Sequence, residues 1–520
     1  MGKTTDGQEP GLVSNGRRLF LLGMAGTAVV LSGCGGGGGN DTVTPAPNEP
    51  APSNPDPDPD PDPQPPTQPP TPQPDSHPPR GLHVSLEDST RRTRSVTWFS
   101  DGKEAPAQRL EYDQPEADWD PQSVQSRPFL KWVYARSEPT FGVEALTHRA
   151  MAPALDPRRP FRYRVGSPEG GWSRVYWLAP IDTQRWSFTH FGDHGISERA
   201  KRVVDESLKH PSDLLLLAGD LSYANGEQPI WDQWFDLAEP LLASTVTMAA
   251  AGNHEAKDGD GLSSGKAFKS RLTHPDPLLN NLNDNPGSTY YPFDVNRVHF
   301  FVSSAGALID DFSLAEELVN LEIDLSKAAL RRLRGEIDFI VLVQHYPIWT
   351  DQLGRSPANF ALVTLQENIL LRYGVDLLLV GHDHVYQRSH RMAYGFRSPF
   401  GYVQVMAGTG GESVRLFDEA PQDWSASQFV GIGLVHYQVE PGRITGEFWG
   451  AAPEGLEDEN RQTVTGPFQP RDRFVVEKRG LLACRDCALP ARSPAELLAD
   501  YPDIVAHTRR RNRLAHEHCG

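Results

Sequence analysis

VDLLLV at residues 375–380 runs directly into GHDH at residues 381–384, so a mainly apolar segment ends in two histidines. A short apolar run of this kind is typical of a strand that is buried on both faces of a sheet. The glycine after the run permits a tight turn, which can aim the next side chains at a point above the sheet. This part of the chain therefore predicts a buried strand and candidate ligands.

Five further apolar segments have the same form, and helical patterns lie between several of them, for example at residues 198–209 and 314–334. Apolar strands that alternate with helices predict buried sheets that are covered on the outside by helices. In such a fold, residues that carry chemistry are expected at the carboxyl ends of the strands. The five segments are SFTHF (187–191), LLLLA (214–218), VTMAA (246–250), VHFFV (298–302) and FIVLV (339–343).

Polar motifs follow four of these segments, as GHDH follows the strand at 375–380. They are GDHG (192–195), GDLSY (219–223), GNHE (252–255) and QH (344–345). Carboxylates and imidazoles are the groups that two-metal hydrolases place around cations about 3.5–4 Å apart. Each motif alone is weak evidence, because Gly-Asp after a strand is usually a turn and a lone histidine is more often structural. Five motifs, all at strand ends, are hard to explain by turn chemistry and predict a two-metal site.

The order of these motifs resembles that of the calcineurin-like metallophosphoesterases, and the Tyr of GDLSY narrows the resemblance to purple acid phosphatases. The likeness extends over about residues 81–478 and includes YYPFDVNRVHFFVSS, VDLLLVGHDHVYQRS and RFVVEK. It implies an α+β fold of the αββα type, in which a two-sheet metallophosphoesterase sandwich is flanked by helices. It also implies an acid phosphatase that acts on small phosphate monoesters.

The resemblance implies a role for each of seven ligands, carried over residue by residue. The ligands of a ferric ion would be Asp193, Tyr223 and His384. The ligands of a divalent ion, which could be Fe, Zn or Mn, would be Asn253, His345 and His382. Asp220 would bridge the two ions. A metal-held hydroxide would attack phosphorus in line, while His254 would contact the phosphoryl group or protonate the leaving oxygen.

One feature departs from the family pattern. Plant and animal members have further histidines soon after the motif that ends here in His345, whereas this chain has none between His345 and His382. A phosphodiesterase or nucleotide hydrolase of the same superfamily is therefore an alternative function. His194 could compensate for the missing histidines, or it could be an exposed loop residue. An inactive surface binding protein is a further alternative, but it would be expected to have a damaged ligand set.

The amino terminus has the pattern of an export signal. Arg17 and Arg18 precede a short apolar run that ends in Leu31-Ser32-Gly33-Cys34. Paired arginines before such a run predict export by the twin-arginine route, and the small residue before Cys34 predicts a lipoprotein cleavage site. Residues 1–33 are then a signal peptide, and a lipid on Cys34 anchors a periplasmic or cell-surface protein to the membrane. The alternative is an amphiphilic leader with a chance cysteine.

Composition divides the rest of the chain into four parts. Residues 34–79, rich in Gly, Pro and Asp, predict a disordered linker, because such a segment cannot bury apolar surface. Residues 80–182 contain short alternating runs, such as SVTW and FRYRVG, that resemble a fibronectin type III-like β-sandwich. The metallophosphoesterase catalytic domain follows at 183–480. Residues 481–520 form a tail whose cysteines could make a disulfide or bind zinc; these are Cys484, Cys487 and Cys519.

The formal net charge is −18, so the protein as a whole offers no electrostatic attraction to a polyanion such as duplex nucleic acid. We therefore expect no nucleic acid among the partners. If the substrate carries phosphate, its attraction has to be local and come from metal cations or a few placed histidines.

Overall fold

The computed structural model describes residues 78–87, 92–116, 127–257, 265–275, 289–305, 313–418, 420–479 and 496. The expectations for the signal peptide, the lipidated Cys34, nearly all of the linker and the three tail cysteines fall outside these residues. Among the helices of the described part, none is long and apolar enough to cross a membrane.

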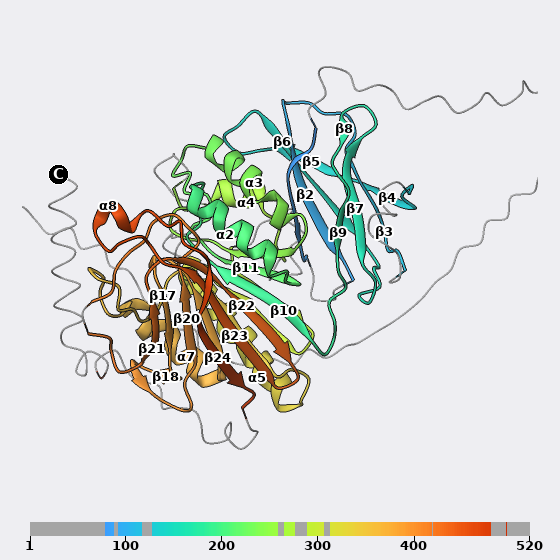
Figure 1. Cartoon of the computed structure of the whole chain (residues 1–520). Coiled ribbons are helices and arrows are strands. Elements are labelled where there is room, and N and C mark those ends of the chain that lie inside the picture. The colour runs from blue at the N-terminus through green and yellow to red at the C-terminus, as the bar shows by residue number, and fades with distance from the viewer. Residues whose placement is uncertain are drawn as a thin grey trace, which may run out of the picture. The chain divides into compact units, whose positions relative to one another are not determined.

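Two sheets pack face to face in the catalytic region (Figure 1), and a shared apolar core lies between them. Phe188 of one sheet packs edge-on against Phe300 of the other with ring centroids 5.8 Å apart. The first sheet has ten strands, in the order β24 (Gln469–Glu477), β23 (Arg443–Ala451), β22 (Ile432–Glu440), β10 (Trp186–Phe191), β11 (Leu214–Ala218), β12 (Val246–Ala250), β1 (Arg80–Ser85), β2 (Arg94–Asp101), β6 (Ala145–Ala152) and β5 (Arg136–Pro139). The second has seven, in the order β13 (Tyr291–Val295), β14 (Val298–Val302), β15 (Phe339–Val343), β16 (Leu377–Val380), β20 (Val403–Ala407), β17 (Tyr386–Ser389) and β21 (Ser425–Phe429).

Strand β11 shows why the apolar runs become central strands. All five of its residues are buried, since Leu214 and Leu216 face the core between the sheets while Leu215 and Leu217 face a second apolar cluster. Strands β10, β11 and β12 are parallel, as are β14, β15, β16 and β20. Because parallel strands end at the same edge, the motifs that follow them are brought together.

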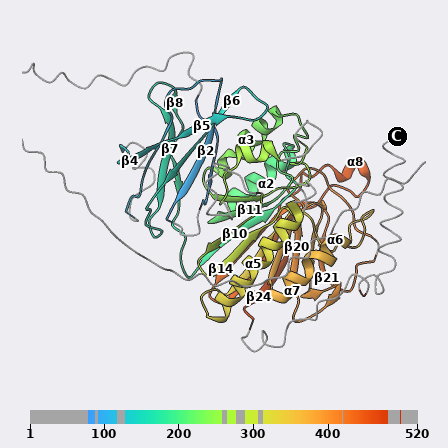
Figure 2. The same cartoon turned by 180° about the vertical axis from the view of Figure 1, so that it is seen from behind.

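Helices cover the outer face of each sheet, which confirms the αββα expectation. Against the ten-stranded sheet lie α2 (Glu198–Lys209), α3 (Pro229–Leu242) and α4 (Lys266–Arg271). Against the seven-stranded sheet lie α5 (Ser313–Leu333), α6 (Phe360–Leu362) and α7 (Asn368–Tyr373), with a π-helical turn at Val363–Glu367 between the last two (Figure 2). The remaining short elements are α8 (Asp458–Arg461) and the hairpin of β18 (Met392–Ala393) and β19 (Phe396–Arg397).

The amino-terminal part of the described chain is all-β, as expected. A five-stranded sheet contains β4 (Lys131–Tyr134), β3 (Arg109–Asp113), β7 (Phe161–Ser167) and β8 (Gly171–Trp172), with β9 (Tyr176–Leu178) also paired to β7. It shares a core with β1, β2 and β6, to which Trp98 and Tyr163 contribute. However, β1 also pairs in parallel with β12 of the catalytic region, at Val84 and Val246. The two regions are therefore joined through one continuous sheet.

Candidate metal centre

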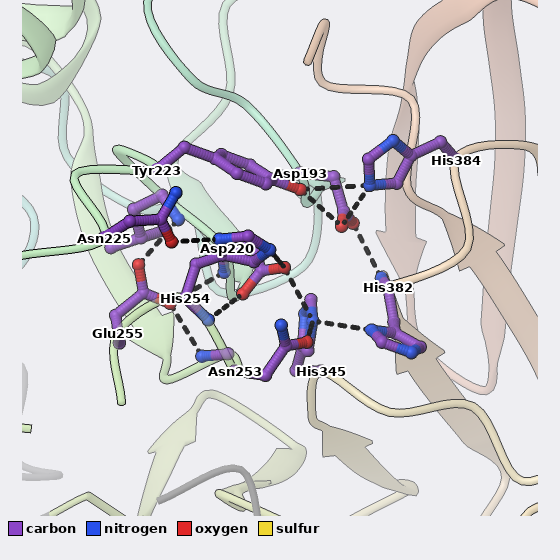
Figure 3. A network of polar contacts seen from close by, with 12 residues as sticks. Asp193, Asp220, Tyr223, Asn225, Asn253, His254, Glu255, His345, His382 and His384 are labelled. Atoms are coloured by element: carbon purple, nitrogen blue, oxygen red, sulfur yellow. Dashed lines mark hydrogen bonds and ion pairs between the residues drawn. The ribbon is translucent and has the colours of Figure 1, made fainter. Parts of the chain in front are cut away.

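The polar motifs gather at the carboxyl ends of five strands. Asp193 follows β10, Asp220 and Tyr223 follow β11, Asn253 follows β12, His345 follows β15, and His382 and His384 follow β16. Figure 3 shows these seven side chains pointing toward one another from the two sheets. The structure thus brings all the predicted metal ligands into one place.

The turns that carry these ligands have an unusual backbone. Asp193, Asp220, Tyr223 and His382 have φ angles of 59°, 52°, 57° and 71°, in the left-handed region. For a residue with a Cβ atom this conformation costs about 1–2 kcal/mol and is found mainly where the surroundings enforce it. Gly252 lets two turns approach, because a Cβ atom there would lie 2.2 Å from Asp220 Oδ1. Glycine in these motifs therefore has two effects: it permits the tight turn, and it lets neighbouring turns pack closely.

One group of ligand atoms belongs to the predicted ferric site. Asp193 Oδ1 lies 3.1 Å from the Tyr223 hydroxyl and 3.2 Å from His384 Nε2. The Tyr223 hydroxyl and His384 Nε2 are 3.0 Å apart. A carboxylate, a phenol and an imidazole therefore converge on one point, with one ligand atom from each.

The second group centres on His345 Nε2. This nitrogen lies 3.1 Å from Asn253 Oδ1, 3.1 Å from Asp220 Oδ2 and 3.2 Å from His382 Nδ1. The ligand atoms of Asp220, His345 and His382 lie within 4.8 Å of one another, as ligands of a single cation do. The backbone N–H of His382 donates to Asp193 Oδ2 at 2.7 Å, which ties the two groups together.

The electrostatics of both groups fit a cation. Burial, with Asp193 and Asp220 nearby, raises the pKa of Tyr223 well above its usual value. Burial lowers the pKa of His345, but the Asp220 carboxylate outweighs it and raises this pKa to about 9. The proton on His345 thus offsets part of the charge of the buried carboxylates, and the proton on Tyr223 keeps its oxygen neutral. Metal cations would replace such protons, since metal ligands bind in their deprotonated forms.

Hydrogen bonds behind the ligands set their orientation. His345 Nδ1 donates to the Ala218 carbonyl at 2.8 Å, which leaves Nε2 for the cation. His384 Nδ1 lies 2.5 Å from Ser413 Oγ. The buried Glu255 carboxylate accepts from the backbone N–H groups of Asp220 and Leu221, each at 2.8 Å, and of Gly252 at 2.7 Å. Partners of this kind fix the ligand geometry and raise metal affinity.

The predicted catalytic residue, His254, lies at the edge of the centre. Its ring packs on that of Tyr223, with centroids 4.2 Å apart, and its Nε2 is 3.8 Å from Asp220 Oδ2. Its Nδ1 lies 2.5 Å from Asn225 Oδ1. Because an amide oxygen can only accept, His254 holds its proton on Nδ1 and presents Nε2 to the centre.

Both expectations for His194 are wrong. The side chain is buried, donates from Nε2 to the Ala200 carbonyl at 3.0 Å, and accepts at Nδ1 from Trp234 Nε1 at 2.9 Å. Burial also lowers its pKa to about 4. With both nitrogens occupied, His194 neither stands in for the missing histidines nor reaches solvent.

Sequence reasoning also missed three supporting residues: Asn225, Glu255 and Ser413. Glu255 belongs to the GNHE motif, and Asn225 lies two residues after the tyrosine of GDLSY. Both residues could therefore have been found from their position in or beside a predicted ligand motif. No sequence motif points to Ser413, because its contact with His384 depends on the folding of a loop that lies 29 residues further along the chain.

This chain is similar to known phosphoesterases and phosphatases. Residues 187–386 match the calcineurin-like phosphoesterase family. Purple acid phosphatase 21 of Arabidopsis thaliana is 26% identical over 369 residues, which cover 69% of this chain and 78% of that protein. The phosphoenolpyruvate phosphatase of Allium cepa is 24% identical over 54% of this chain and 61% of its own.

The fold has also been seen in a solved structure. The purple acid phosphatase PPD1 from yellow lupin superposes with a TM-score of 0.63 over 80% of this chain and 78% of its own, at 18% sequence identity. This chain thus carries a calcineurin-like phosphoesterase domain and is a hydrolase that acts on phosphate esters. Its predicted likeness to purple acid phosphatases is confirmed.

Proposed function

We propose that this protein is an exported acid phosphatase that hydrolyses phosphate monoesters at a dinuclear metal centre. The observation that carries the proposal is the convergence of two ligand groups at the carboxyl ends of strands from both sheets. The ligand atoms of Asp193, Tyr223 and His384 lie 3.0–3.2 Å apart. In the second group, three ligand atoms lie 3.1–3.2 Å from His345 Nε2. Asp193, Tyr223 and His384 would hold a ferric ion. Asn253, His345 and His382 would hold a divalent Fe, Zn or Mn ion, and Asp220 would bridge the pair.

When bound, the two cations supply Lewis-acid polarisation of the phosphoryl oxygens and lower the pKa of a coordinated water toward about 7. The protein positions the groups around them. Glu255 holds the turn of Asp220 against the turn of Asn253 through three backbone hydrogen bonds. Asn225 accepts from the Nδ1–H of His254, so Nε2 faces the centre and can donate to a phosphoryl oxygen when the imidazole is protonated, as the charge on that oxygen increases during attack.

We further propose that the protein is anchored outside the cytoplasm by a lipid on Cys34. The support is the sequence pattern alone, namely the Arg17-Arg18 pair and the small residue before the cysteine. Replacing Cys34 with Ala should move the protein from the membrane fraction to the soluble fraction. Retention in the membrane fraction would contradict the anchor.

The first test measures metal content, visible absorption and phosphate release of the purified protein before and after chelation. We expect two metals per chain, a charge-transfer band from tyrosinate to iron, and release that stops on chelation and returns with metal. A colourless active protein with two other metals would remove the ferric assignment and the role of Tyr223. A protein that binds no metal and releases no phosphate would contradict the proposal.

A further inference from the structure

The edge strand β4 of the five-stranded sheet exposes a row of large apolar side chains. Leu130, Trp132 and Tyr134 are 80%, 51% and 62% exposed. Alternate residues of a strand point to the same face, so these side chains lie in one row along β4 and the residue before it. In the described chain β4 pairs with β3 alone, and folded proteins usually protect such edges with charges or covering segments. An exposed row of this kind marks a surface that binds a partner.

Positive charge lies directly behind this row. On the neighbouring strands β3 and β7, Arg109 and Arg164 both donate to the carboxylate of Glu111, one to Oε1 and the other to Oε2. Two guanidinium groups share one carboxylate, so one positive charge of this trio is not offset. The guanidinium carbon of Arg109 lies 5.6 Å from the ring centroid of Trp132 and 5.1 Å from that of Trp172. Cations are therefore held beside the exposed aromatic rings.

A further positive charge lies on β4 itself. Lys131 is exposed between Leu130 and Trp132, and its ammonium nitrogen lies 5.9 Å from the ring centroid of Tyr112. Among the residues that the structure describes, no carboxylate forms an ion pair with this ammonium group. The row thus combines apolar side chains with cations, although the protein as a whole carries a net charge of −18. A partner that complements this surface is both apolar and anionic.

The arrangement of the two exposed rings distinguishes between anionic partners. Trp132 and Tyr134 meet edge to face, with ring centroids 4.8 Å apart and an interplanar angle of 70°. A polysaccharide stacks successive sugar rings on aromatic faces that lie in one plane, which this pair does not offer. A lipid surface has no such requirement, because Trp and Tyr rings insert among the headgroups in any tilt while Lys and Arg attract anionic headgroups. The geometry therefore favours lipid.

We infer that the β4 face, defined by Leu130, Lys131, Trp132 and Tyr134, binds the surface of an anionic lipid bilayer. The three apolar side chains enter the headgroup region, and the cations on and behind β4 attract the negative charge of the lipids. The inference goes beyond the proposed phosphatase, because no residue of the metal centre takes part. It is also independent of a lipid on Cys34, although the two contacts would reinforce each other in one protein.

The test uses the metal-loaded chain of residues 34–520 with Cys34→Ala, which has neither the predicted signal peptide nor a lipid. This protein is sedimented with vesicles of phosphatidylcholine and phosphatidylglycerol in equal parts, and with vesicles of phosphatidylcholine alone. We expect stronger binding to the anionic vesicles, and binding that weakens as salt is added. Trp132→Ala combined with Tyr134→Ala should weaken it at least about 10-fold, because two large side chains no longer leave water. Lys131→Ala should weaken it about 5-fold.

The matched control is Phe396→Ala in β19, which removes an aromatic side chain that is 57% exposed but belongs to the catalytic region. It should bind vesicles as strongly as the parent chain does. Thermal unfolding shows whether each variant is folded, independently of phosphatase activity, and Lys131→Ala tests the same face if the double variant does not fold. The inference would be overturned by a folded parent chain that does not bind anionic vesicles, or by folded β4 variants that bind as the parent does. Binding to polygalacturonate but not to vesicles would overturn it in favour of an anionic polysaccharide.

Discussion

Asp193, Asp220, Tyr223 and His382 combine a strained backbone with a proposed role as metal ligands, and the strain has a structural cause. Each residue takes a left-handed φ, and the backbone N–H groups of Asp193, Asp220 and His382 are held by hydrogen bonds. Asp220 N is held by Glu255 Oε2, and His382 N is held by Asp193 Oδ2. Strain of this kind persists only where the surroundings over-determine it, and it keeps the ligands in place before a cation arrives.

Glu255 is the residue on which this arrangement most depends. A Glu255→Gln change replaces one acceptor oxygen with an NH2 group that faces a backbone N–H, so at least one of the three donors loses its partner. An unsatisfied buried donor costs about 1–3 kcal/mol. We expect metal affinity to fall about 10- to 100-fold, as for other partners of ligands, in a calorimetric metal titration. Wild-type affinity in this variant would show that the three hydrogen bonds do not set the turn.

Asn225 is predicted to act on catalysis without acting on metal binding. Asn225→Ala removes the acceptor of His254 Nδ1, so the imidazole loses its fixed orientation. We expect kcat to fall on the order of 10-fold or more, within the range for a displaced catalytic histidine, while metal content stays the same. Asn320→Ala is the control, because Asn320 on α5 donates to the Tyr290 hydroxyl and to none of the predicted ligands. Loss of metal in Asn225→Ala would assign it a role in ligand geometry.

At the scale of elements, α5 is joined to the β13–β14 hairpin by a buried ion pair network. His299 on β14 lies with Nδ1 2.8 Å from Asp294 of β13 and Nε2 2.7 Å from Asp324 of α5. Burial lowers the pKa of His299, but the two carboxylates outweigh burial and raise the pKa to about 9. The histidine is therefore charged in the native protein at neutral pH.

This network predicts a pH dependence of stability. The native pKa lies above the usual histidine value of 6.5, so the stabilisation is full below about pH 6.5 and is lost as pH rises through about 9. The contribution is on the order of 1–3 kcal/mol. Denaturant unfolding at pH 6 and pH 9 should show this loss in the wild type and a smaller one in His299→Gln. Equal losses in both proteins would assign the dependence to other groups.

Patterns along the chain predicted the elements that carry the centre, because each one is a local signal. An apolar run such as LLLLA is buried on both faces, and the motif after it lies at the strand end whatever the neighbouring strands are. Contacts between distant segments gave no such signal. The burial of His194 depends on Trp234, and the Ser413 contact depends on the packing of a loop against His384. These features follow from tertiary packing and could not be predicted from spacing.

At the scale of the whole molecule, β1 pairs with β12, and local sequence patterns could not predict this pairing. The pairing affects the stability of the catalytic region. The β-sandwich was expected as a separate domain, yet its strands extend the catalytic sheet. Side chains reinforce the junction, since the buried Tyr163 hydroxyl donates to the Ala243 carbonyl at 2.7 Å. The backbone of Leu82 also donates to Glu239 of α3 at 3.2 Å.

Removing residues 80–182 should therefore destabilise the catalytic domain. Strand β12 would become the edge of its sheet, and an exposed apolar edge strand pairs readily with other chains. We expect a chain that starts at residue 183 to aggregate, and a chain that starts at residue 80 to unfold in one calorimetric transition. Tyr163→Phe tests the junction within the intact chain: it leaves the Ala243 carbonyl without its donor and should lower the free energy of unfolding by about 1–3 kcal/mol. Two separate transitions in the longer chain would mean that the sandwich folds independently, with the continuous sheet adding little to the stability of the catalytic part.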